Sequence, residues 1–387
     1  MAKICLFLPG NVMHSFLLGD RWQKMYDEQV GLNAIGASNI PVVISHQGIE
    51  YELCPFLLDI HRKYPNILVA NAPYSHALLP FVSPKQCKWE TRTLTGALPI
   101  TFFSEFYSPE SDFIPTEFFF FLRSQTCSYS MIFGVKYKEG VSDLEVDQML
   151  PSKTISVRYN NRIGIVLEGF DKFNLAWFAF TSIPNQENLN KVIREFEILV
   201  ADPRKVVVVP MDLEQPYVGS VTGEKIWTIF FDELKRKGLA DNIVDIRYFL
   251  NEFRESAVPI RRPHRILTKW TSHLVQIHYL QRLARLKPIT EKERIIYALA
   301  SASDLLSSWN RFVMSSNKEP MTILCKDLQG NEFIMSQDHN KPLQEACLAA
   351  LQSLEKGDRK LADKLAKIEQ PTELILRLAE FAAIKGL

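Results

Sequence analysis

The chain has 387 residues, of which 47% are apolar and 23% are charged, and its formal net charge is +1. That apolar fraction supports a sizeable core and excludes an intrinsically disordered protein, which combines low hydrophobicity with high net charge. A net charge near zero gives no overall attraction to nucleic acid or to an anionic membrane, so we expect neither as a partner.

Short motifs exclude several further classes of protein. Six scattered cysteines without a Cys-x-x-Cys pair indicate neither a zinc module nor a disulfide framework. The sequence contains no Gly-rich phosphate loop, no G-x-S-x-G elbow and no H-E-x-x-H pair. The first apolar run, Ile4 to Leu8, is too short for a signal peptide, and no run approaches the roughly 18 residues of a membrane span. We therefore expect a cytoplasmic protein without a metal site.

Short, uninterrupted apolar runs predict strands in the first two thirds of the chain. These runs are residues 2–9, 40–47, 66–72, 99–107, 128–137, 162–170, 205–212 and 242–250. Runs of this kind are typical of parallel strands that are covered on both faces. The four phenylalanines from Phe118 to Phe121, in contrast, we assign to a buried helix.

Amphipathic segments between these runs predict helices at residues 48–65, 187–202 and 223–239, the last with Gly238 as its C-cap. Strand–helix alternation of this kind indicates an α/β fold, and a closed barrel is a natural way to pack so many units.

After residue 265 the strand signals fade. Helices are expected at residues 271–286 and 290–314 and in two or three segments between 341 and 387, with one hairpin around Gly330. The chain is thus predicted to consist of a barrel domain, residues 1–260, and a helical region, residues 261–387.

Acidic residues follow two of the predicted strands, where the chemistry of parallel α/β folds gathers. They are Glu105, Glu110 and Asp112 after one strand, and Asp212 and Glu214 after the other. Burial at the tip of an apolar strand raises the pKa of a carboxyl group, as a general acid requires. Two such carboxyl groups on opposite sides of a sugar could serve as nucleophile and acid/base. The alternative for each acid is a helix N-cap or a loop salt bridge.

Four segments, in this order, resemble motifs of glycoside hydrolase family 57. APYSHALLPFV (residues 72–82) resembles the run that follows the third strand of the family. FYSPES (residues 106–111) resembles the motif of the nucleophile, and VVVVPMDLEQPYVG (residues 206–219) resembles the strand and Asp-x-Glu of the acid/base. ASASDLLSSW (residues 300–309) is similar to a later Ser-Asp-x-x-Trp region. The resemblance spans roughly residues 1–315.

The resemblance implies a distorted (β/α)7 barrel whose cleft is completed by the helical C-terminal region. It implies a retaining glycoside hydrolase or 4-α-glucanotransferase that acts on α-1,4-linked glucans, an oligo- or polysaccharide substrate, without a metal or other cofactor. Glu110 would be the nucleophile and Asp212 the acid/base. The residues that would contact substrate are His14, His76, Tyr107, Glu214, Trp270, Asp304 and Trp309. The oligomeric state is left open.

The end of the first predicted strand departs from the family pattern. Family members usually carry His-Gln-Pro there, whereas this chain reads LPGNVMHSF. His14 could take the place of the missing histidine, or the pair His46–Gln47 could, although a merely polar strand end is the favoured interpretation of that pair. Two other functions therefore stay open. One is a catalytically inactive glycan-binding relative; the other is a barrel-type carbohydrate deacetylase, which would need an Asp and two His as metal ligands, and no suitably spaced His pair exists.

Overall fold

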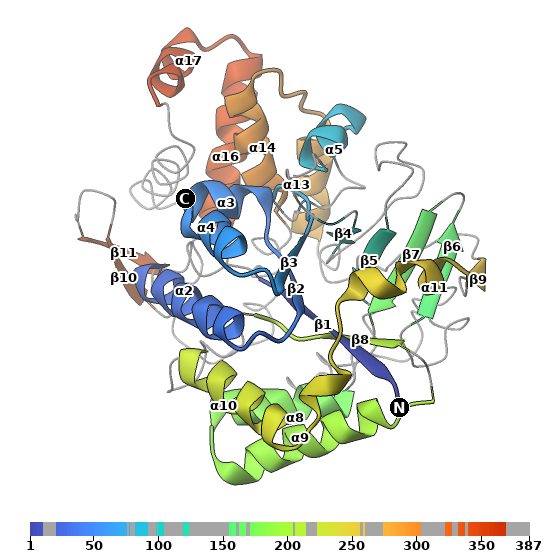
Figure 1. Cartoon of the computed structure of the whole chain (residues 1–387). Coiled ribbons are helices and arrows are strands. Elements are labelled where there is room, and N and C mark those ends of the chain that lie inside the picture. Colours follow the sequence, from blue (N-terminus) through green and yellow to red (C-terminus); the bar gives the residue numbers. More distant parts are fainter. Residues whose placement is uncertain are drawn as a thin grey trace.

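The computed structural model describes the greater part of the chain, namely residues 1–10, 21–75, 77, 82–91, 98, 100–103, 119–123, 155–159, 162–167, 171–203, 206–213, 223–255, 258–259, 274–302, 322–326, 332–336 and 340–368. These residues form a mixed α/β fold, in which one group of strands lies in the middle among helices and a second group lies at the right-hand side of the view (Figure 1). The α/β class predicted from strand–helix alternation is therefore confirmed.

A four-stranded sheet lies at the centre of the fold, and all of its strands are parallel, in the order β3-β2-β1-β8. The strands are β1 (Lys3–Pro9), β2 (Val42–Ser45), β3 (Ile67–Ala70) and β8 (Val206–Pro210). Every residue of β2 and β8 is buried, because apolar side chains cover both faces of the sheet. All four strands lie within apolar runs from which we predicted strands.

A second sheet has five strands in the order β4-β5-β7-β6-β9. They are β4 (Ile100–Phe103), β5 (Phe119–Arg123), β6 (Ile155–Tyr159), β7 (Arg162–Leu167) and β9 (Val258–Pro259). β4, β5 and β7 pair in parallel, but β6 pairs antiparallel with β7. A parallel bridge between Asn71 and Thr101 links the two sheets. Closure of these strands into a barrel stays a prediction.

The helix predicted at Phe118–Phe121 is wrong, because Phe119–Arg123 form strand β5 between β4 and β7. Phenylalanine fits the pleated surface of a strand, and an apolar run this short is better suited to a buried strand than to a helix.

The strand predicted at residues 242–250 is also wrong. Only Ile243 pairs with the sheet, through a single bridge to Ile4. The segment instead forms 3-10 turns, η3 (Ala240–Asn242) and η4 (Ile246–Phe249), followed by helix α11 (Leu250–Glu255). The Asp245 side chain accepts a hydrogen bond from the Arg247 N–H (2.8 Å), which favours a turn over an extended chain.

Helices cover one face of the central sheet. They are α2 (Arg21–Ala37), α3 (Gly48–Leu53), α4 (Phe56–Lys63), α8 (Asp171–Ser182), α9 (Gln186–Val200) and α10 (Gly223–Arg236). The predictions at residues 187–202 and 223–239 are confirmed, and Gly238 has the positive φ (68°) of a C-terminal glycine. The segment predicted at residues 48–65 is helical but divides into α3 and α4 at Pro55.

The C-terminal region contains helices α13 (Leu274–Ala284), α14 (Glu291–Ser301), α16 (Asn340–Glu355) and α17 (Arg359–Ala366). The predicted hairpin is confirmed as the antiparallel pair β10 (Thr322–Lys326) and β11 (Glu332–Ser336). Helix α14 ends earlier than predicted, at Ser301, and Ala302 then forms an antiparallel bridge with Ala77. Within the described ranges, no helix is both long enough and apolar enough to cross a membrane.

Candidate functional site

One of the predicted site residues, Asp212, lies within the part of the chain that the structure describes. The other predicted residues lie outside the described residues, and their roles stay predictions: Glu110, His14, His76, Tyr107, Glu214, Trp270, Asp304 and Trp309. The structure nevertheless describes residues that are adjacent or nearly adjacent in sequence to His76, Glu214 and Asp304.

Asp212 follows β8 at the carboxyl end of the central sheet. The chain keeps pairing with β1 beyond β8, because the Met211 N–H donates to the Phe7 carbonyl (2.8 Å) and the Leu213 N–H donates to the Pro9 carbonyl (2.9 Å). Met211 and Leu213 are buried, whereas Asp212 between them is partly exposed. The backbone is thus held on both sides of Asp212, which is itself partly exposed.

Alternating residues of the central strands contribute to two separate apolar clusters. The small cluster consists of Cys5, Phe7, Val43, Leu68, Ala70, Leu98, Ile100, Val206, Val208, Ile246 and Phe253. The large core lies on the other face of the sheet, against the helices, and includes Val207, Val209, Met211 and Leu213. Asp212 is in step with Val206 and Val208. It therefore stands on the small-cluster face of the sheet, at its carboxyl edge.

His46 follows β2 at the same edge but is buried, with 2% of its surface exposed. Its ring packs edge-on against Tyr51, with 5.9 Å between ring centroids. A Cβ atom built on Gly10 would lie 2.3 Å from His46 Nε2, so the imidazole fills the space beside the residue that follows β1. The Gln47 N–H donates to Glu50 Oε2 (2.9 Å) at the start of α3. These contacts give His46–Gln47 a packing role, which agrees with the favoured interpretation of this pair.

A second histidine, the half-buried His61 on α4, lies beside His46, with 6.4 Å between their ring centroids. Burial, together with the nearby His46, lowers the pKa of His61 to about 3. The pair and Tyr51 form an aromatic cluster under the ends of β1 and β2. Within the described ranges, no group of three or more His, Cys, Asp or Glu side chains is arranged to hold a metal ion.

The segment after β3 leads directly to the predicted substrate residue His76. Tyr74 and Ser75 are each 1% exposed. The Tyr74 N–H donates to the Glu90 carbonyl (2.8 Å), and the Ile49 N–H donates to the Tyr74 carbonyl (3.0 Å). On the other side of His76, Ala77 bridges to Ala302 at the end of α14. The bridge therefore brings together the chain neighbours of His76 and of a second predicted residue, Asp304.

Glu90 is a buried acid that sequence reasoning does not single out. It ends helix α5 (Pro84–Glu90), has 0% exposure and contacts Ser75. The sequence of this helix, PKQCKWE, mixes charged, polar and apolar residues and carries no signal that its last residue is buried.

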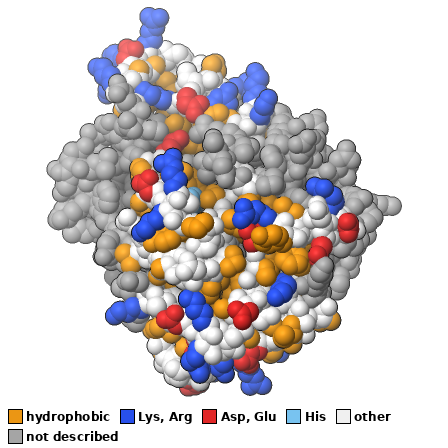
Figure 2. Space-filling model, viewed as in Figure 1, with side chains coloured by type: hydrophobic (Ala, Val, Ile, Leu, Met, Phe, Trp, Pro, Cys, Tyr) orange, Lys and Arg blue, Asp and Glu red, His pale blue; other side chains and the backbone are white. Residues whose placement is uncertain are grey.

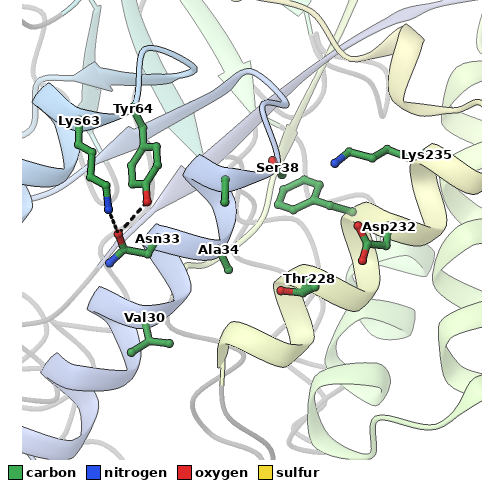
Figure 3. Close-up of a pocket in the computed structure, with 11 residues that line it drawn as sticks. Val30, Asn33, Ala34, Ser38, Lys63, Tyr64, Thr228, Asp232 and Lys235 are labelled. Atoms are coloured by element: carbon green, nitrogen blue, oxygen red, sulfur yellow. Dashed lines mark hydrogen bonds between the residues drawn. The ribbon is translucent and has the colours of Figure 1, made fainter.

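A groove of about 480 Å³ lies between α2, α10 and the end of α4 (Figure 3). Lys63 Nζ and Tyr64 Oη both donate to Asn33 Oδ1, at 3.1 and 2.9 Å. These polar groups of the groove are thus paired with one another. The groove lies among helices of the large core, contains no predicted site residue and does not include Asp212. We do not assign the substrate site to it.

Charged side chains of both signs are interspersed on the face shown in Figure 2. The described part of this face presents no broad region of a single charge sign. This mixture of signs matches the net charge of +1.

The sequence matches no protein-family model and no curated protein, but solved structures match its fold. A GH57-type branching enzyme from Pyrococcus horikoshii aligns over 96% of this chain and 95% of its own, with a TM-score of 0.57 and 11% identity. A GH57 branching enzyme from Thermococcus kodakaraensis, in complex with glucose, aligns over 97% of this chain and 95% of its own, with a TM-score of 0.53 and 10% identity. At such low identities the likeness shows the fold alone: the chain has a fold similar to that of GH57 enzymes.

A 4-alpha-glucanotransferase from Thermococcus litoralis aligns over 87% of this chain and 63% of its own, with 12% identity. Its TM-score of 0.48 is too low to support a conclusion about the fold.

Proposed function

We propose that this chain is a retaining glycoside hydrolase or 4-α-glucanotransferase that acts on α-1,4-linked glucans. The observation that carries the proposal is the position of Asp212, at the carboxyl edge of a parallel sheet in a chain whose GH57-like fold extends over nearly its whole length. Barrels of parallel strands have their catalytic groups at that edge. Because both neighbours with the higher TM-scores are branching enzymes, transfer to a sugar hydroxyl is part of the proposal.

The proposal includes a ring of seven parallel strands in the order β1-β2-β3-β4-β5-β7-β8. Parallel pairing links most neighbours in this order, and the Asn71–Thr101 bridge links β3 to β4. β7 also comes close to β8, where the ring would close. Such a ring would enclose the small cluster and leave Asp212 at its mouth. The C-terminal helices would complete the cleft beside the Ala77–Ala302 bridge.

In this scheme the Glu110 carboxylate attacks the anomeric carbon while Asp212 donates a proton to the glycosidic oxygen that leaves. The product is a covalent glycosyl–enzyme. Asp212, now a carboxylate, takes a proton from water or from a sugar hydroxyl, which then displaces Glu110. Two such carboxyl groups are expected about 5–5.5 Å apart.

The remaining site residues would bind the glucan. His14, His76 and Asp304 would form hydrogen bonds with sugar hydroxyls, and Glu214 would hold a hydroxyl or tune Asp212. Tyr107, Trp270 and Trp309 would stack on sugar rings, whose axial C–H bonds carry partial positive charge and favour aromatic faces.

The test is to incubate the wild type, Glu110→Gln and Asp212→Asn with maltooligosaccharides and with amylose, and to follow chain length by chromatography and linkage by proton NMR. We expect new chain lengths with the wild type and none with either variant. Longer products indicate transfer, shorter products alone indicate hydrolysis, and new α-1,6 signals indicate branching. Unchanged substrates with the wild type would overturn the proposal.

One observation favours a second candidate, an inactive glycan-binding protein. β1 ends at Pro9, and the His46 ring leaves no space for a side chain at Gly10, so position 10 cannot hold a sugar through a side chain. Calorimetric titration with maltoheptaose separates the candidates, because a binding protein would give heat of binding without new chain lengths.

A further inference from the structure

We infer that Glu90 is a positioning residue for the substrate site. Its main-chain carbonyl and its buried carboxyl group hold Tyr74 and Ser75 in place, and so fix the main chain that leads into the next residue, His76. The inference rests on the proposed function, in which His76 contacts substrate.

Glu90 holds two consecutive residues, one with its main chain and one with its side chain. Its carbonyl accepts the Tyr74 N–H at 2.8 Å. Its Oε2 accepts the Ser75 N–H at 3.1 Å, and the Ser75 hydroxyl lies 3.1 Å from the same oxygen. Its Oε1 accepts the side-chain amide of Gln86 at 3.2 Å. Both carboxylate oxygens are thus engaged in a site with 0% exposure.

Burying a carboxyl group costs free energy unless hydrogen bonds compensate for its lost hydration. Here the Ser75 and Gln86 donors supply these hydrogen bonds. The same hydrogen bonds fix the position of the Ser75 peptide group. What they provide is a defined geometry at the residue that precedes His76.

Helix α5, which ends at Glu90, is hydrogen-bonded to helix α14 of the C-terminal region. The Gln86 amide also donates to the Arg294 carbonyl (3.3 Å), and Trp89 Nε1 donates to Glu291 Oε2 (2.9 Å). The Trp89 ring packs against Tyr74, with 4.5 Å between centroids. Helix α5 thus braces the segment after β3 against α14, the helix whose end bridges to Ala77 on the far side of His76.

The test compares Glu90→Gln with Glu293→Gln, a matched control that also replaces a carboxyl group accepting main-chain N–H bonds, here those of Ile289 and Thr290 at the start of α14. In Glu90→Gln the new amide must face either the Ser75 N–H or the Gln86 amide, so two donors oppose each other unless Gln86 turns away from Arg294. We expect kcat/KM on maltooligosaccharides to fall by about 10–100-fold, the size of effect that a small misplacement causes. Glu293→Gln should stay within about twofold of wild type, because the contacts of Glu293 lie in the capping box at the start of α14.

Hydrogen exchange provides a readout that needs no substrate. Peptides covering residues 72–78 should exchange faster in Glu90→Gln and at the wild-type rate in Glu293→Gln, although both variants lower the unfolding temperature. Ser75→Ala, which keeps the peptide N–H and removes only the hydroxyl, should show a smaller effect in the same direction. It replaces Glu90→Gln in the comparison if the latter does not fold.

Unchanged exchange at residues 72–78 would overturn the inference about Glu90 alone. Faster exchange with undiminished kcat/KM would also overturn it, since the segment would then be held without consequence for the substrate. A wild type without activity on any α-glucan would overturn the proposed function, and the exchange result would still decide whether Glu90 holds the segment.

Discussion

The two faces of the central sheet come from alternate residues of the same strands, yet they are covered differently. The large core contains several aromatic side chains. Among them, the Trp177 ring lies 5.0 Å from the Trp227 ring and 5.1 Å from the Phe230 ring, between centroids. The small cluster contains aliphatic side chains, phenylalanine and cysteine, and Asp212 follows it at the carboxyl edge. Because apolar burial scales with area, the large core carries most of the stability. We therefore expect substitutions on the large-core face to change stability and substitutions on the small-cluster face to change catalysis.

The largest effect is expected on the small-cluster face. Asp212→Asn should lower kcat on maltooligosaccharides by about 10²–10⁴-fold, the contribution of one general acid–base group. The unfolding free energy should change little, since this carboxylate is partly exposed. Steady-state kinetics and urea unfolding check the two halves of this prediction.

Asp232→Asn on α10 is the matched control, because it removes an exposed carboxylate from the groove beside the large core. Wild-type kinetics are expected for it. If the two variants behaved alike, the separation of the faces would be wrong.

On the large-core face, Trp227→Ala should cost about 3–5 kcal/mol of unfolding free energy, the usual loss when a buried aromatic leaves a cavity. Trp227 is fully buried and packs 5.0 Å from Trp177 and 5.8 Å from Phe231, between ring centroids. Urea unfolding measures the loss. At a temperature where the variant stays folded, its kcat should equal that of wild type.

Trp227→Phe sharpens this prediction. Among the described residues, Trp227 Nε1 has no hydrogen-bond partner. Phenylalanine fills much of the space and removes a buried donor that costs free energy, so its loss should be well below that of alanine. Equal losses for the two variants would mean that the indole N–H is satisfied.

The sequence predicts the central sheet well. Residues Val206 to Val209 are all apolar, and a short run of this kind fits a parallel strand that is buried on both faces. The sequence prediction fails where one pattern suits two structures. Phe118–Phe121 could be helix or strand by periodicity, and the neighbours β4 and β7 decide for the strand. At residues 242–250 the apolar pattern suggests a strand, but the Asp245 cap turns the chain.

For the candidate site, an acid directly after an apolar strand is a local signal, and Asp212 is found at the expected sheet edge. Glu90 carries no such signal. Its role depends on Ser75 and Gln86, which converge on it only when α5 packs against the segment after β3. Likewise, the sequence cannot show that the His46 ring fills the space beside Gly10, because these residues belong to neighbouring strands.

Gly10, which follows β1 at the carboxyl edge of the central sheet, allows a further test. In Gly10→Ala the new Cβ would lie 2.3 Å from His46 Nε2, and the ring is held against Tyr51. Overpacking of this kind costs about 1–3 kcal/mol, which urea unfolding can measure. The double variant Gly10→Ala/His46→Ala should lose less than the sum of the single variants, because the ring that causes the clash is gone.

Gly238→Ala is the control for Gly10. No atom lies within 4 Å of the added Cβ, so any cost comes from the positive φ of 68°. This cost should be the same with or without His46. Strict additivity of Gly10→Ala and His46→Ala would contradict the contact between them.

The smallest effect should arise from His61, on the large-core side of the same edge. Its pKa is about 3 in the folded protein, against about 6.5 for an ordinary histidine. As the pH falls below 6.5, the unfolded chain binds a proton at this position that the folded chain does not, so folding loses stability until the pH approaches 3. Between pH 7.5 and 5.5 the loss should be about 1 kcal/mol. His61→Gln should flatten the pH dependence of the urea midpoint by that amount, whereas His278→Gln, at an exposed position on α13, should leave it as in wild type. An unchanged slope in His61→Gln would mean that water reaches the imidazole in the folded protein.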